Sequence, residues 1–194
     1  MNYNKEAYPT DLKNLLIEAN SIASEITQKL NDKDCPRLCD LYMEMHKTCG
    51  ANPEYSVIRD KNSFEELGYI PNIKSGKSKS QNEFKGLYVF GEEVDGAIIP
   101  IYVGISRTVY RRLRQHGWGK KHNECSLAYL KARFDDNELT RKNVDDKLHL
   151  RSKKKIIRSC KVVLIPEAED YNLYFLEVAI AGILKTKWNS FRTH

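Results

Sequence analysis

The feature that most constrains this chain is a pair of strand-like runs near its middle. Gly86–Phe90 and Ile98–Val103 are rich in β-forming residues, which is typical of paired strands. Asp95-Gly96 lies between them, and this dipeptide tolerates the positive φ angles of tight hairpin turns. The sequence therefore predicts a β-hairpin, with residues 91–97 forming a rather long connecting loop.

Helical periodicity dominates the rest of the chain. Before the hairpin, apolar residues at helical spacing predict a helix from Thr10 or Asp11 to Leu30, and a second helix is expected over 36–49. After the hairpin we expect a helix that begins at Ser106 or Thr108 and ends at His116. The remaining expectations are helices over 125–134 and 171–185, a strand over 160–166, and surface segments over 135–143 and 151–155.

Charge is distributed unevenly along the chain. Residues 1–73 hold 8 Lys+Arg and 12 Asp+Glu, a net −4, whereas residues 74–194 hold 24 and 14, a net +10. We therefore expect a helical extension of unknown role at 1–73, a basic linker or loop at 74–83, and a basic domain at 84–194. Such a domain indicates either a polyanionic partner or a lysine-rich solvated surface.

Targeting and membrane signals are weak. The first residues lack the basic-then-apolar pattern of a secretion signal, and the apolar run at 178–184 is too short to span a bilayer. We therefore expect a cytoplasmic protein with no membrane partner.

The cysteines suggest free thiols, because their number is odd and no secretion signal precedes them. A zinc site would need several of them to converge. A straight helix would spread the four candidate ligands over about 21 Å, which favours a buried Cys/Met face that includes Met43. These candidates are Cys35, Cys39, His46 and Cys49.

Glu177 is the only charged residue between Leu173 and Leu184, in a helix that is otherwise apolar on one face. Burial of an unpaired carboxylate is costly and forces it toward protonation. Either an ion pair with one of the many basic residues or a role as metal ligand or catalytic acid explains its position.

The helix expected over 108–116 is rich in arginine. Arg112 and His116 are four residues apart and share a face. Arginine suits phosphate because its planar guanidinium donates two parallel hydrogen bonds and keeps its charge. The alternative is a basic helix face in solvent. The arginines of this region are Arg107, Arg111, Arg112 and Arg114.

Each strand of the expected hairpin carries one tyrosine next to a glycine. Tyr88 follows Gly86-Leu87, and Tyr102 precedes Val103-Gly104. Paired strands can bring the two phenols to one face, where they could exchange protons or position water. Simple packing of two tyrosines in a sheet is the alternative.

Taken in order, these elements resemble the GIY-YIG nuclease family over about residues 84–192. The resemblance rests on two tripeptides and four single residues at characteristic spacing. Leu87 stands where the family usually has isoleucine, which is a conservative change. The matching elements are Gly86-Leu87-Tyr88, Tyr102-Val103-Gly104, Arg112, His116, Glu177 and Asn189.

The resemblance implies an α+β fold over 84–192, with a small three-stranded antiparallel sheet flanked by helices. The N-terminal helical extension lies outside the resemblance and is expected from apolar periodicity alone. It implies that Glu177 binds one divalent metal ion, Mg²⁺ or alternatively Mn²⁺. Arg112 would hold the scissile phosphate, and Tyr88 or Tyr102 would activate the attacking water. His116 would contact phosphate or assist proton transfer, and Asn189 would bind phosphate or brace the site.

The resemblance therefore implies a metal-dependent endonuclease that hydrolyses phosphodiester bonds in DNA, of the restriction or mobile-element type. Further substrate contacts are expected from four neighbouring residues: Lys85, Ser106, Arg107 and Arg111. A catalytically silent nucleic-acid-binding module, an RNA nuclease, and a protein whose basic face binds an acidic protein partner are the alternatives.

Overall fold

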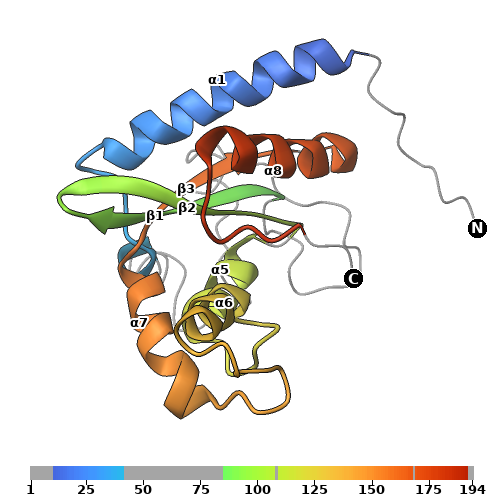
Figure 1. Ribbon diagram of the computed structural model, residues 1–194. Coiled ribbons are helices and arrows are strands. Elements are labelled where there is room, and N and C mark those ends of the chain that lie inside the picture. The colour runs from blue at the N-terminus through green and yellow to red at the C-terminus, as the bar shows by residue number, and fades with distance from the viewer. Residues whose placement is uncertain (1–10, 42–84, 108, 168, 192–194) are drawn as a thin grey trace, which may run out of the picture.

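The computed structural model describes residues 11–41, 85–107, 109–167 and 169–191 (Figure 1). The predicted linker at 74–83, most of the helix predicted over 36–49, and Thr108 lie outside these ranges. His46 and Cys49, considered above as zinc ligands, lie outside them too. The other two zinc candidates, Cys35 and Cys39, are half-buried. Cys35 lies before the helical residues that begin at Leu38.

A three-stranded antiparallel sheet forms the centre of the described structure. Its strands are β1 (Gly86–Val94), β2 (Ala97–Ser106) and β3 (Lys161–Pro166). The strand order is β2-β1-β3, and both pairings are antiparallel. This confirms the mixed helix-and-strand fold with a small antiparallel sheet between helices.

The hairpin differs from its prediction in the length of its loop. The strands continue to Val94 and resume at Ala97, so only Asp95 and Gly96 form the turn. Both have positive φ, 51° and 80°, as a two-residue hairpin turn requires. The long loop predicted over 91–97 was therefore wrong, because a strand can carry both charges of this segment: Glu92 pairs with Lys131, and Glu93 is exposed.

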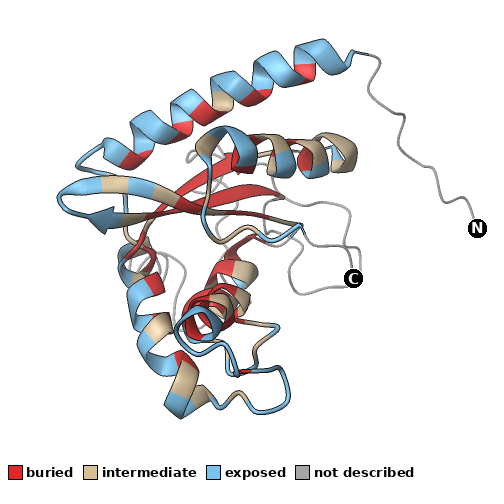
Figure 2. Cartoon of the chain, viewed as in Figure 1, coloured by how far each residue is buried: buried red, intermediate tan, exposed pale blue. Residues whose placement is uncertain are grey.

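Helices cover both faces of the sheet (Figure 1). On one side lie α1 (Leu12–Asn31) and α8 (Asp170–Leu184), and on the other α5 (Val109–Trp118), α6 (Ser126–Asp135) and α7 (Arg151–Ser159). Alternate strand residues face opposite ways, so the sheet supplies two cores (Figure 2). Tyr88 and Phe90 belong to the core beneath α5, and Leu87 and Val89 to the core beneath α8.

The first helix is part of the second core. Asp11 caps α1 by accepting hydrogen bonds from the backbone of Lys13 and Asn14. The buried stripe of α1 packs with the sheet and α8, and it comprises Ala19, Ala23, Ile26 and Leu30. Residues 12–31 of the expected N-terminal extension therefore share a core with the predicted nuclease domain.

The segment over 151–155, expected to lie on the surface, is part of α7. Lys154 is only 7% exposed and Ile157 is fully buried. A short π-helix, Asp146–Leu150, precedes α7. The surface prediction holds for Arg151, Ser152 and Lys155, which are exposed, and fails for Lys154, whose ammonium group binds Asp146 and the backbone oxygen of Gly119. None of the helices within the described ranges is long and apolar enough to cross a membrane.

Candidate active site

The glycines of the two tripeptides lie where no side chain fits. A Cβ atom on Gly86 would overlap the carbonyl oxygen of Ile165 on β3. A Cβ atom on Gly104 would overlap the hydroxyl group and ring of Tyr88, which is paired opposite it. The second glycine thus lets the phenol of Tyr88 lie across the edge strand β2.

The hydroxyl group of Tyr88 lies 2.9 Å from Nε2 of His116 on α5. Both side chains are buried, with 1% and 0% of their surface exposed. Burial and the charge of Arg112 hold the pKa of His116 well below 6.5, so its imidazole is neutral. Within the described residues, Nδ1 of His116 has no hydrogen-bond partner.

The ring of Tyr102 completes an aromatic cluster with these two side chains. Its centroid lies 6.2 Å from that of Tyr88 and 5.5 Å from that of His116. Burial raises the pKa of both phenols, and the charge of Glu177 acts in the same direction. Arg112 lowers the pKa of both phenols, which places its guanidinium close to their hydroxyl groups.

Arg112 is held by the segment that joins α5 to α6. Its Nη1 donates to the backbone oxygens of Glu124 at 2.9 Å and Asn123 at 3.2 Å. Its Nη2 donates to the hydroxyl of Ser126 at 2.8 Å. These bonds fix the plane of the guanidinium and use most of the donor capacity of Nη1.

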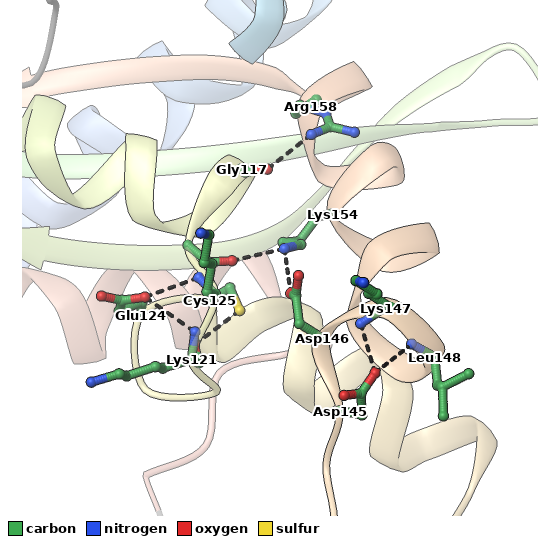
Figure 3. Close-up of polar contacts among 12 residues, drawn as sticks. Gly117, Lys121, Glu124, Cys125, Asp145, Asp146, Lys147, Leu148, Lys154 and Arg158 are labelled. Carbon is green, nitrogen blue, oxygen red and sulfur yellow. Dashed lines mark hydrogen bonds and ion pairs between the residues drawn. The ribbon is translucent and has the colours of Figure 1, made fainter.

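The segment that holds Arg112 is braced by α7 (Figure 3). Arg158 donates to the backbone oxygen of Gly117 at 3.2 Å. Lys154 donates to the backbone oxygen of Gly119 and to Asp146. The carboxylate of Glu124 accepts the backbone N–H groups of Lys120 and Lys121, as a local cap. Arg158 and Lys154 thus fix the end of α5 and the start of the segment that holds Arg112.

Glu177 enters this region from α8. Burial alone raises the pKa of its carboxyl to about 7, and within the described residues no hydrogen bond or ion pair engages the carboxylate. Its charge raises the pKa of Tyr88 and Tyr102, although α8 packs on the other face of the sheet. The edge position of β2 allows groups from both faces to approach one another.

Asn189 binds the open edge of β2. Its Oδ1 accepts the backbone N–H of Val103 at 2.8 Å, and its Nδ2 donates to the backbone oxygen of Val103 at 2.7 Å. Thr186 donates to the same Oδ1. Since Val103 lies between Tyr102 and Gly104, Asn189 braces the strand that carries the site.

The four expected substrate contacts lie in different settings. Lys85 and Arg107 both form ion pairs with Asp170 at the start of α8, at 2.6 and 2.5 Å. These two cations lower the pKa of the Asp170 carboxyl. Arg111 is exposed on α5, and Ser106 is half-buried at the end of β2.

Some contributors to the site have no signal in the sequence. Ser126, the carbonyl groups of Asn123 and Glu124, and Asp170 were not predicted, since each acts through a contact with a residue distant in sequence. Gln115, which accepts a weak hydrogen bond from Arg112 at 3.3 Å, is three residues further along the same helix and could have been expected.

Within the described residues, no three acidic, histidine or cysteine side chains come together as a group that could hold a metal ion. Comparisons of the chain with models of protein families, with curated proteins and with solved structures found no match.

Proposed function

We propose that this protein is a metal-dependent endonuclease of the GIY-YIG type, acting on DNA. The observation that carries the proposal is the hydrogen bond between Tyr88 and His116, buried beside Arg112 and within the electrostatic reach of Glu177. Two phenols, a neutral imidazole, a guanidinium and an unpaired carboxylate together supply proton transfer and anion binding. This is the chemistry that phosphodiester hydrolysis requires.

Glu177 fits the single protein ligand of a hard divalent cation. Its carboxylate is desolvated and lacks a compensating cation in the described structure, so that a metal ion would relieve an existing electrostatic cost. Mg²⁺ commonly keeps several waters and needs one or two protein carboxylates; Mn²⁺ accepts the same oxygen donors. When bound, such a cation supplies charge stabilisation and acidifies a water molecule.

Arg112 is the proposed anchor for the scissile phosphate. Its guanidinium is held rigidly by backbone carbonyls, so little conformational entropy is lost when an anion binds. A fixed donor next to the reacting group can also stabilise charge that develops in the transition state.

Tyr88 and His116 form the proposed route for the proton of the attacking water. Tyr88 accepts that proton while its own hydroxyl proton passes to Nε2 of His116, so no free phenolate is required. Burial lowers the pKa of His116, and the charge of Arg112 lowers it further. An anionic phosphate beside Arg112 would offset that charge and make His116 a better proton acceptor.

The test is cleavage of supercoiled plasmid DNA by the purified chain with Mg²⁺ and with EDTA. We expect nicked or linear products with Mg²⁺ only, and none from Glu177→Gln. Glu18→Gln is the matched control, because Glu18 is an exposed carboxylate on α1, a helix that carries none of the site residues. Cleavage by Glu177→Gln at the wild-type rate would contradict the assignment.

Two further outcomes separate the alternatives. A labelled RNA of the same sequence, cut faster than the DNA, would identify an RNA nuclease. Tight, salt-sensitive DNA binding without cleavage of any substrate would identify a silent binding module, because phosphate contacts weaken steeply as salt rises.

A further inference from the structure

An aromatic and cationic cluster lies beside the candidate active site and takes no part in it. Phe134 at the end of α6 and Trp188 after α8 contact each other edge to face, with ring centroids 5.4 Å apart. The Nζ atom of Lys187 lies 4.2 Å from the centroid of Phe134 and 4.9 Å from that of Trp188. We call Phe134, Lys187 and Trp188 the aromatic platform.

Within the platform, Trp188 is fixed against the sheet, whereas Phe134 is exposed to solvent. The backbone N–H of Trp188 donates to the carbonyl of Ile101 on β2. Lys131, which is 7% exposed and paired with Glu92 at 2.7 Å, lies 5.1 Å from the ring centroid of Trp188. Phe134, by contrast, is 65% exposed. Packing therefore explains the position of Trp188 but leaves most of Phe134 in water.

The platform lies along the same strand edge as the site. Trp188 binds β2 at Ile101, and Asn189 binds it at Val103. Ile101 precedes Gly104, against which Tyr88 lies, by three residues, or about 10 Å of strand.

We infer that the aromatic platform binds an unpaired base of the nucleic acid beside the bond that is cut. An exposed ring next to ammonium groups offers both a stacking surface and neutralisation of the adjacent phosphate. Lys187 is exposed, so its ammonium can move from the ring to a phosphate when a base stacks. The inference rests on the proposed function and narrows the substrate to DNA with a locally unpaired strand.

The experiment measures binding in EDTA, where cleavage is not needed. Affinities are compared for two 30-base-pair DNA duplexes that differ only by one unpaired 2-aminopurine. We expect the protein to bind the unpaired-base duplex about tenfold more tightly, as one base–aromatic stack provides, and to quench the 2-aminopurine fluorescence. Phe134→Ala should abolish both effects, whereas Phe134→Trp should retain them.

Leu148→Ala is the matched control, because Leu148 is an apolar side chain that is 79% exposed on another element. An equal preference in the wild type and Phe134→Ala, no preference in the wild type, or no binding to either duplex would overturn the inference. If the preference depends on Phe134 but Mg²⁺ supports no cleavage, the platform stands and the proposed nuclease activity fails. If cleavage occurs without the preference, only the platform fails.

Discussion

The hydroxyl group of Tyr88 lies against the backbone of Gly104 on the adjacent strand, in space that any side chain at position 104 would fill. The same hydroxyl is hydrogen-bonded to His116. One glycine thus makes room for the hydrogen bond at the centre of the candidate active site. The tripeptide that ends at Gly104 therefore has a physical reason, independent of any family resemblance.

Gly104→Ala should displace the Tyr88 ring and break its bond to His116. We expect a loss of about 1–3 kcal/mol in the free energy of unfolding, as for other overpacked cores, and a large loss of cleavage activity. Urea denaturation and plasmid cleavage measure the two effects. Gly182→Ala is the control: no atom lies within 4 Å of its added Cβ, and alanine should stabilise α8 by up to about 1 kcal/mol. Equal behaviour of the two variants would refute this account.

Tyr88→Phe should impair cleavage more than Tyr102→Phe, because the hydroxyl group of Tyr88 is the one hydrogen-bonded to His116. We expect a fall of about 100-fold or more in the single-turnover rate for Tyr88→Phe, the usual size of a general-base contribution. Tyr102→Phe should lose about tenfold. DNA affinity measured in EDTA should change little in either variant. The reverse order of rates would assign the base to Tyr102.

His116 should make the protein less stable at acidic pH. Its pKa is lowered in the folded state, so below about pH 6.5 the unfolded chain binds a proton that the folded chain does not. The contribution of His116 is thus complete above that pH and is lost as the pH falls. The stability difference between the wild type and His116→Gln should therefore be smaller at pH 5 than at pH 8, in urea denaturation. A difference that is the same at both pH values would show that His116 titrates normally.

Glu177 should have the opposite pH dependence. Burial raises its pKa from 4.5 to about 7, so the folded chain keeps a proton that the unfolded chain releases between those values. Its effect on stability is therefore favourable at low pH and lost as the pH rises toward 7. At pH 8 without metal, the free energy of unfolding of Glu177→Gln should be higher than that of the wild type by about 1–2 kcal/mol. This value is reduced for partial solvent exposure of the side chain.

Divalent metal gives the second readout for Glu177. Mg²⁺ should raise the melting temperature of the wild type at pH 8 but not that of Glu177→Gln, because a ligand that binds only the folded state stabilises it. The increase should shrink below pH 7, where protons compete with the metal for the carboxylate. An identical Mg²⁺ response in both proteins would remove Glu177 from the metal site.

Local sequence patterns predicted most of the helices and strands within the described ranges, but not α7 or the π-helix before it. Runs of β-forming residues and the Asp95-Gly96 dipeptide predict the hairpin, and apolar periodicity predicts α1 and α8, because these signals depend on near neighbours in the chain. The four-residue spacing of Arg112 and His116 likewise places both on one helix face.

Only the tertiary structure decided how these residues are held. Lys154 belongs to a segment expected at the surface, yet it binds the carbonyl group of Gly119 in the segment that positions Arg112. Lys85 and Arg107 appeared to be open to substrate, yet both pair with Asp170. The sequence by itself determined which chemical groups are available and which elements carry them. Their partners, burial and pKa values were decided by the packing of segments far apart in the chain, because a side chain's electrostatic environment is set by what surrounds it in space.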